Sequence, residues 1–205
     1  MMASNGYIVV APNRRGVLTH GQDWTDQIST DNSGQAMQDL LSGIDAVKEE
    51  SYVDEEKLGA IGASFGGFSV FWLAGNHEKR FSAFIAHCGV FNSEMEYMTT
   101  EEMFFDQWEK GGPPWEEDNN VAQRSFAGSP HNFVQNWDTP IMVVHGEHDY
   151  RIPYTQGMAA FNAAQMLGIP SKFLFFPSEN HWILSPQNGI LWQREFRTWL
   201  DLYLK

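Results

Sequence analysis

The segment 62–67 reads Gly-Ala-Ser-Phe-Gly-Gly and contains the pattern Gly-x-Ser-x-Gly. A short apolar run, Leu58–Ile61, leads into this motif, and a helical stretch, Phe68–Leu73, leaves it. A serine between a strand and a helix lies on a tight, strained turn, which projects its hydroxyl above the edge of the sheet. We therefore expect Ser64 to be a nucleophile for acyl transfer and the backbone N–H of Phe65 to stabilise the oxyanion.

A serine hydroxyl is a poor nucleophile unless a base and an orienting carboxylate accompany it, in the chain order Ser, Asp, His for this kind of turn. Asp149 follows the apolar run Ile141–His145, and His181 follows the run Lys172–Phe176. The carboxyl ends of parallel strands meet at one edge of a sheet, where ligands bind. The sequence thus predicts a catalytic triad of Ser64, Asp149 and His181.

Other residues near these positions offer alternatives. Glu147 and Asp138 are alternatives for the acid, although Asp138 precedes its strand and would lie at the opposite edge. His148 is next to Asp149 and too close in sequence to be easily oriented by it. A metal site made of His145, Glu147, His148 and Asp149 is compatible with the residue types, but such residues alternate in direction along a strand end. We expect His145 to be a core or supporting residue, and we expect no metal and no cofactor.

The elements that must position these residues alternate between strands and helices. The predicted strands are the apolar runs Tyr7–Ala11, Leu58–Ile61, Ala83–His87, Ile141–His145 and Lys172–Phe176. The predicted helices span Ser33–Glu50, Phe65–Gly75, Tyr154–Leu167 and Gln187–Leu204. This order is typical of an α/β fold with a mostly parallel sheet flanked by helices.

Residues 91–136 interrupt this alternation. The segment is acidic and aromatic, and we expect a helix near Thr99–Lys110 within it. A connection of this length is usually a lid, a binding insertion or a contact with another domain. The alternative interpretation is an insertion that only covers the core.

Composition limits the classes of partner. The chain has 205 residues and a formal net charge of −13, which argues against nucleic acid and anionic membranes because both require a basic face. Cys88 is the only cysteine, so no disulfide can form within the chain. The length predicts a single domain, 1–205. The compartment (periplasmic or cytoplasmic) and the formation of a homo-oligomer stay open.

The first residues predict that the chain is a fragment. Gly6 occupies the position of a helix C-cap, and the apolar run Tyr7–Ala11 follows it at once. We therefore expect a C-terminal piece of a longer protein, with a short natural N-terminus and a fraying first turn as the alternative.

Four segments together give the whole chain a resemblance to a known family. They are 12–16 (Pro-Asn-Arg-Arg-Gly), the serine motif 62–67, the stretch Thr139–Pro153 and the tripeptide Asn180-His181-Trp182. The chain resembles the C-terminal catalytic domain of the prolyl oligopeptidase family, within the α/β-hydrolase superfamily. It is most similar to the dipeptidyl-peptidase and acylaminoacyl-peptidase branches.

The resemblance implies a serine peptidase that cleaves short peptides through an acyl-enzyme, with an N-terminal β-propeller on the same polypeptide limiting access. It assigns Ser64 as nucleophile, Asp149 as orienting acid and His181 as base, and the Phe65 amide as one oxyanion donor. By their places after strands it also assigns a substrate pocket, whose members are Phe91, Ile152 and Tyr97 or Met98.

Three parts of the family pattern are missing from this sequence. The loop that carries the second oxyanion donor lies upstream in the family, and so does a strand between the first two strands of this chain. The propeller is also upstream. The alternatives to a peptidase are therefore a carboxylesterase or lipase with the same triad, and a catalytically incomplete fragment.

Overall fold

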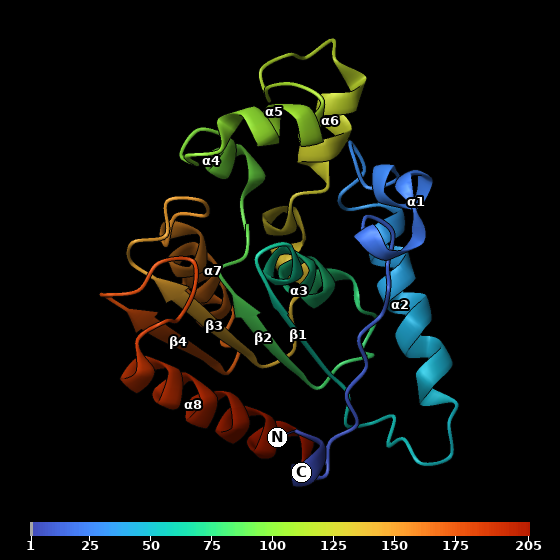
Figure 1. The fold of residues 1–205 in the computed structure, drawn as a ribbon, viewed down its shortest axis with the longest axis vertical. Coiled ribbons are helices and arrows are strands. Elements are labelled where there is room, and N and C mark those ends of the chain that lie inside the picture. Colours follow the sequence, from blue (N-terminus) through green and yellow to red (C-terminus); the bar gives the residue numbers. More distant parts are fainter. Residues whose placement is uncertain (1) are drawn as a thin grey trace.

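A four-stranded parallel sheet forms the centre of the structure, a computed structural model that describes residues 2–205. Its strands, in spatial order, are β1 (Gly59–Ala63), β2 (Ala83–His87), β3 (Ile141–Gly146) and β4 (Ser171–Phe176). Every neighbouring pair is parallel, so the strands all end at the same edge (Figure 1). The predicted α/β fold with a parallel sheet is confirmed.

Helices connect and cover the strands. The α-helices are α1 (Gln22–Asp26), α2 (Gln35–Lys48), α3 (Phe65–Asn76), α4 (Ser93–Tyr97), α5 (Met103–Lys110), α6 (Asn120–Ala127), α7 (Thr155–Met166) and α8 (Pro186–Leu204). Three short 3-10 helices are η1 (Ala3–Asn5), η2 (Leu18–His20) and η3 (Pro130–Asn136). The four helices predicted outside the insertion are present as α2, α3, α7 and α8, and their ends differ from the predictions by no more than two residues.

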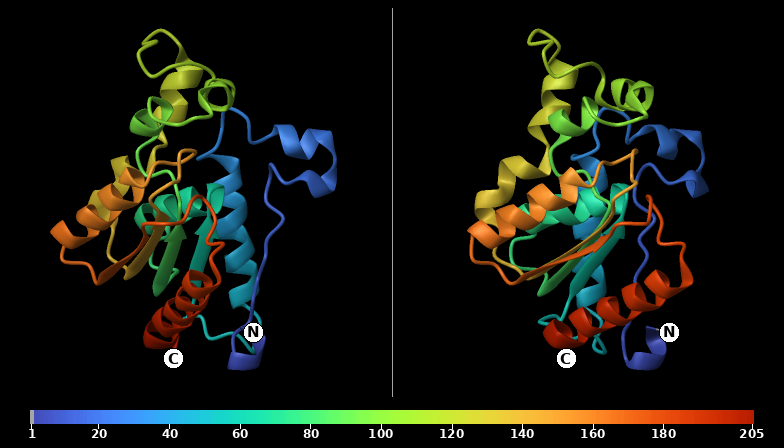
Figure 2. Two further views of the ribbon diagram at one scale, coloured as in Figure 1. Left: turned by 60° about the vertical axis from the view of Figure 1, so that its left-hand side comes forward. Right: turned by 90° about the vertical axis from the view of Figure 1, so that its left-hand side faces the viewer.

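The two central strands are buried on both faces. Phe84 of β2 and Val143 of β3 pack into the cluster beneath α3, whereas Ile85 and Met142 pack into the cluster beneath α8. Successive side chains of a strand point to opposite faces, so continuous apolar runs are what a sheet covered on both sides requires. Figure 2 shows α8 along one face, with α3 and α7 on the other.

The prediction of a buried strand at Tyr7–Ala11 is wrong. This segment has no ladder partner among the described residues, and Ile8 and Val9 are 54% and 67% exposed. An apolar run becomes a strand only when another strand satisfies its backbone groups, and β1 is an edge strand here with no described strand between it and this segment. The chain therefore supplies four strands rather than about five. Gly6 does cap a helix end, with φ of 85°, but the helix is the three-residue η1.

The insertion 91–136 folds into α4, α5, α6 and η3, of which α4–α6 lie above the edge where the strands end (Figure 1). The predicted helix Thr99–Lys110 is shorter and begins at Met103. A small apolar cluster of Tyr97, Ala122 and Phe126 joins α4 to α6. No helix of the described chain is both long and apolar enough to cross a bilayer.

We expect Phe71→Ala to destabilise the fold strongly. The Phe71 ring is fully buried and contacts the rings of Phe91 and Trp137 at centroid distances of 5.7 and 6.0 Å. Truncation leaves a cavity, which should cost about 3–5 kcal/mol in urea unfolding. The matched control is Phe104→Ala in α5, whose ring is 76% exposed and whose loss should change stability by no more than about 0.5 kcal/mol. Equal effects of the two variants would contradict this packing.

Candidate active site

Ser64 lies on a strained turn between β1 and α3. Its φ and ψ are 60° and −119°, a backbone conformation that a residue with a side chain rarely adopts. Such strain costs of order 1–3 kcal/mol and persists where the surroundings enforce it. Helix α3 starts at the next residue, Phe65, so the first amides of the helix have no acceptor within the helix itself. The turn thus has the form that the sequence predicts.

Close backbone packing enforces the turn. A Cβ added to Gly62 would lie 2.2 Å from the carbonyl oxygen of Gly66, and one added to Gly67 would lie 2.5 Å from that of His87. Gly89 meets Gly67 in the same way, at 2.3 Å from its carbonyl carbon. A Cβ on Gly66, in contrast, would meet nothing within 4 Å. Helix α3 therefore approaches the ends of β1 and β2 only because these glycines carry no side chain.

Asp149 lies in the loop after β3 and is a buried acceptor for several donors. Its Oδ2 is 2.7 Å from His181 Nδ1, and its Oδ1 accepts from the amides of Ile152 at 3.0 Å and Arg151 at 3.2 Å. Burial alone would raise the pKa of Asp149, but hydrogen bonds from His145, His181 and the Ile152 amide outweigh it and lower the pKa below its ordinary value. Asp149 is therefore held as a carboxylate against the imidazole of His181.

The loop that carries His181 is anchored by a second buried acid, Glu179. The Glu179 carboxylate accepts from the amides of Leu184 (2.9 Å) and Ser185 (3.2 Å) and from the side chain of Asn188 (2.6 Å). These bonds, first those from Ser185 and Asn188, lower the pKa of Glu179 to about 2. Because α8 begins at Pro186, the carboxylate also lies at the positive end of that helix.

The Asp149 and His181 loops pack backbone against backbone. The amide of His148 donates to the carbonyl of Glu179 at 2.9 Å. A Cβ on Gly146 would lie 2.3 Å from the carbonyl oxygen of Asn180. The two loops therefore hold the Asp149–His181 bond from both sides.

Cys88 is a site neighbour that sequence reasoning missed. Its Sγ lies 3.8 Å from His181 Nε2 and 3.6 Å from the His181 carbonyl oxygen. It also contacts the backbone of Ser64, whose amide donates to the His87 carbonyl at 3.0 Å. The hydrogen bonds found among the described residues do not include one from Ser64 Oγ to His181, a bond that is often long before substrate binds. The only advance signal was the position of Cys88 directly after β2.

The same contacts bear on metal binding. Cys88, Asp149 and His181 have ligand atoms within 4.8 Å of one another. Burial raises the pKa of the Cys88 thiol to about 12, and a protonated thiol is a poor metal ligand. Asp149 and His181 are already bonded to each other, so the arrangement fits a proton relay better than a metal centre.

The structure separates the alternative acids and metal ligands from the site. Glu147 and His148 are exposed, whereas His145 and Asp149 are buried, so these four side chains do not face one cavity. Asp138 lies before β3, with Oδ1 3.3 Å from His77 Nε2, at the opposite edge of the sheet.

Of the residues assigned to the substrate pocket, Ile152 lies beside Asp149 and is buried. Phe91 packs in the core against Phe71, and Tyr97 packs in the cluster of the insertion. Met98 is 57% exposed. Within residues 2–205, no hydrogen bond, ion pair or ring contact joins Phe91, Tyr97 or Met98 to the imidazole, and their role in binding stays a prediction.

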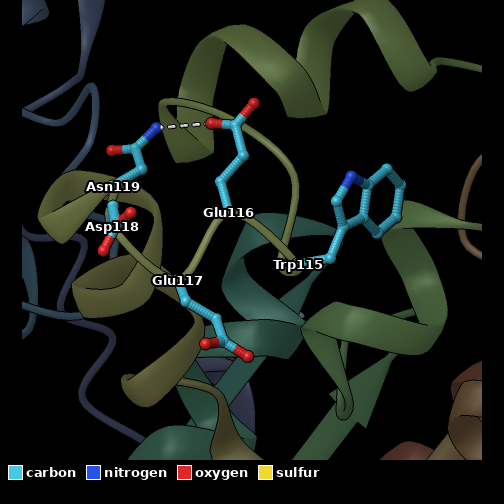
Figure 3. A pocket seen from close by; sticks show the side chains of 5 residues that line it. All are labelled: Trp115, Glu116, Glu117, Asp118 and Asn119. Atoms are coloured by element: carbon cyan, nitrogen blue, oxygen red, sulfur yellow. Dashed lines mark hydrogen bonds between the residues drawn. The ribbon is translucent and has the colours of Figure 1, made fainter.

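Two hollows open on this side of the molecule. One, of about 630 Å³, lies beside the two loops, and its lining includes Glu101, Tyr150, Arg151, His181 and Trp182. The other, of about 580 Å³, lies in the insertion and is lined by Trp115, Glu116, Glu117, Asp118 and Asn119 (Figure 3). In it Asn119 donates to Glu116 Oε2 at 2.9 Å. Only the first hollow adjoins the Asp149–His181 pair.

Comparison with known proteins identifies the family of this chain. A model of the prolyl oligopeptidase family of peptidases matches residues 1–205. The chain therefore belongs to the prolyl oligopeptidase family, as its sequence motifs predict.

Its relatives include proteins named dipeptidyl-peptidase 5. That of Porphyromonas gingivalis is 60% identical over 205 residues, and that of Schizosaccharomyces pombe is 40% identical over 207 residues. Both alignments cover the whole chain, which spans only 30% of the length of either relative. Among solved structures, the acylaminoacyl peptidase of Pyrococcus horikoshii has a TM-score of 0.87 at 24% identity, covering 94% of this chain and 32% of its own. This likeness confirms the α/β-hydrolase type of fold.

We expect Gly62→Ala to destabilise the turn because its new methyl group meets backbone that cannot move aside. Overpacking of this kind costs about 1–3 kcal/mol or more. The matched control is Gly66→Ala, where space is open and alanine should favour the helix by up to about 1 kcal/mol. Thermal unfolding of both variants checks the order, and a Gly62→Ala protein as stable as wild type would refute it.

We expect Glu179→Gln to lower the unfolding temperature at neutral pH and much less in acid. The lowered pKa of Glu179 means that its contribution is present above the ordinary value of about 4.3 and is lost as the pH falls toward about 2. The difference in unfolding temperature between wild type and variant should therefore disappear between about pH 5 and about pH 2, the range set by the ordinary and the lowered pKa of Glu179. Glu147→Gln, in the exposed side chain of the neighbouring loop, is the control and should show no such gap.

Proposed function

We propose that the polypeptide containing this chain is a serine peptidase that hydrolyses short peptides, with Ser64 as nucleophile, His181 as base and Asp149 as orienting acid. The observation that carries the proposal is the 2.7 Å bond from His181 Nδ1 to the buried Asp149 carboxylate, beside the strained turn of Ser64. Membership of the family supports the same reading.

In the first step Ser64 Oγ attacks the carbonyl carbon of the substrate, and its proton passes to His181 Nε2. The Asp149 carboxylate stabilises the imidazolium and holds the tautomer in which Nδ1 carries hydrogen. The amide N–H of Phe65, at the start of α3, faces the negative oxygen as one donor of the oxyanion hole. The tetrahedral intermediate then breaks its C–N bond, and the imidazolium gives its proton to the leaving amine.

In the second step a water molecule attacks the acyl group on Ser64. His181 takes one proton from the water and returns it to Ser64 Oγ when the ester bond breaks. The reaction therefore slows as the pH falls and the imidazole becomes protonated, because a protonated imidazole cannot act as the base.

Because its relatives are named dipeptidyl-peptidase 5, we propose release of dipeptides, rather than removal of acylated residues, as the reaction of this polypeptide. We propose, as the resemblance implies, a β-propeller upstream on the same polypeptide, and the 30% coverage of the relatives leaves length for it. The second oxyanion donor would belong to that upstream part. Loss of one such donor typically costs about 10²–10³ in rate, so the 205-residue chain alone should turn over far more slowly than the full-length protein.

We expect a fluorophosphonate probe to label the full-length protein at Ser64, because the probe reacts with a serine that a base activates. Ser64→Ala should abolish labelling, and Asp149→Asn should slow turnover by about 10⁴-fold through the wrong imidazole tautomer. Mass spectrometry of the labelled peptide gives the position. Absence of labelling in a folded full-length protein would contradict the proposal.

Substrate choice separates the peptidase from an esterase. Dipeptide amides with a free amine, acylated amino-acid amides and simple nitrophenyl esters can be compared by kcat/KM on the same preparation. A peptidase of the proposed type prefers the first group, and a carboxylesterase or lipase hydrolyses only the esters.

A further inference from the structure

His145 is a buried imidazole that the mechanism above does not use. It lies at the end of β3 and is fully buried. Its Nε2 is 2.7 Å from the carbonyl oxygen of Ile152 and 3.4 Å from Oδ2 of Asp149. A second histidine therefore reaches the carboxylate that orients His181.

The surroundings of His145 determine which ring nitrogen carries hydrogen. Both neighbours of Nε2 are acceptors, so Nε2 must donate. Nδ1 is buried with no hydrogen-bond partner among the described residues, and it faces Gly157, where an added Cβ would lie 2.7 Å away. A hydrogen on Nδ1 would be a buried donor without an acceptor, which costs about 1–3 kcal/mol. The hydrogen that His145 donates therefore lies on Nε2.

These bonds close a ring around the Asp149 turn. The amide of Ile152 donates to Asp149 Oδ1 at 3.0 Å, while the carbonyl of the same residue accepts from His145. One imidazole thus fixes the far side of the turn and also approaches the carboxylate itself. The contact of His145 with the carboxylate is one of the causes that lower the pKa of Asp149.

We propose that His145 is a positioning residue that sets both the orientation of the Asp149 carboxylate and its effective charge toward His181. The inference rests on the proposed function, because it concerns the triad of that site. Without the Nε2 donor the carboxylate charge is less neutralised, so Asp149 stabilises the imidazolium of His181 more strongly. The base then becomes protonated at a higher pH.

Other titratable groups face this site and must stay constant in a test. His87, the last residue of β2, and Cys88, the residue after it, lie near Asp149 and His181. Burial lowers the pKa of His87 to about 4 and raises that of Cys88 to about 12, so both are uncharged at neutral pH. From the Asp149 loop, Arg151 pairs with Glu102 of the insertion at 3.0 Å. None of these contacts involves the His145 ring nitrogen that donates.

The test compares His145→Phe with His145→Gln in the full-length protein. Phenylalanine keeps the ring and removes the donor, whereas the glutamine amide places a donor close to the position of Nε2. For His145→Phe we expect kcat to fall about 10–100-fold, the range found when a group that orients a functional side chain is removed, with a smaller change in KM. The acid limb of its kcat/KM–pH profile should move to higher pH, and His145→Gln should restore both properties toward wild type.

His77→Phe is the matched control. It removes another buried imidazole, one at the C-terminal end of α3 whose Nε2 lies 3.3 Å from Asp138 Oδ1 at the opposite edge of the sheet. We expect its acid limb to stay near that of wild type. Circular dichroism and thermal unfolding establish that each variant folds. If His145→Phe does not fold, His145→Asn replaces it, because its shorter amide cannot reach both acceptors.

The outcomes are distinct. An acid limb that stays in place or moves to lower pH in the folded variant overturns the inference, as does a glutamine variant no better than the phenylalanine one. A wild-type protein that the fluorophosphonate probe fails to label refutes the proposed function instead. Labelling of wild type together with a shifted limb in His145→Phe supports both.

Discussion

The hydrogen bond between His181 and Asp149 is the contact on which the rest of the site depends. A carboxylate removed from water is costly unless donors replace its hydration. Here backbone amides and two imidazoles do so, and each donor belongs to a segment that must be held in place. The buried Glu179 holds the loop of His181, and Gly146 lets the two loops touch. The packing of these loops therefore holds the donors that offset the cost of burying the ionised Asp149 carboxylate.

The parallel sheet brings these segments together. Each strand ends at the same edge, so the turn after β1, the residue after β2 and the loops after β3 and β4 meet there although they are far apart in sequence. Ser64, Cys88, Asp149 and His181 come from these four places in turn. A single geometric property of the fold thus brings together the proposed nucleophile, base and orienting acid, with a buried thiol against the proposed base.

Much of this arrangement could be predicted because local patterns agree with the tertiary environment. Continuous apolar runs predict β2 and β3 since both faces of these strands are covered, and the glycine-flanked serine predicts the turn. The run Tyr7–Ala11 is similarly apolar, yet none of the strands in the described part of the chain pairs with it, and a local pattern does not report whether a partner strand is present. Cys88 escaped assignment for a related reason. Its place in the site depends on contact with His181, 93 residues away in the sequence, whereas His145 was expected to be a core or supporting residue and its contacts with Asp149 and Ile152 became visible only in the folded turn.

The open side of β1 has a consequence for handling the chain. Ile61 is 48% exposed on this strand, and the backbone groups along its outer edge have no ladder partner in the described residues. An unpaired, apolar strand edge is a template for pairing with another chain. The net negative charge of the chain opposes such pairing between copies, because molecules of like charge repel one another. Self-association of this chain should therefore depend on ionic strength. Salt screens the repulsion between molecules, so the edge of β1 can then pair with a strand of another molecule.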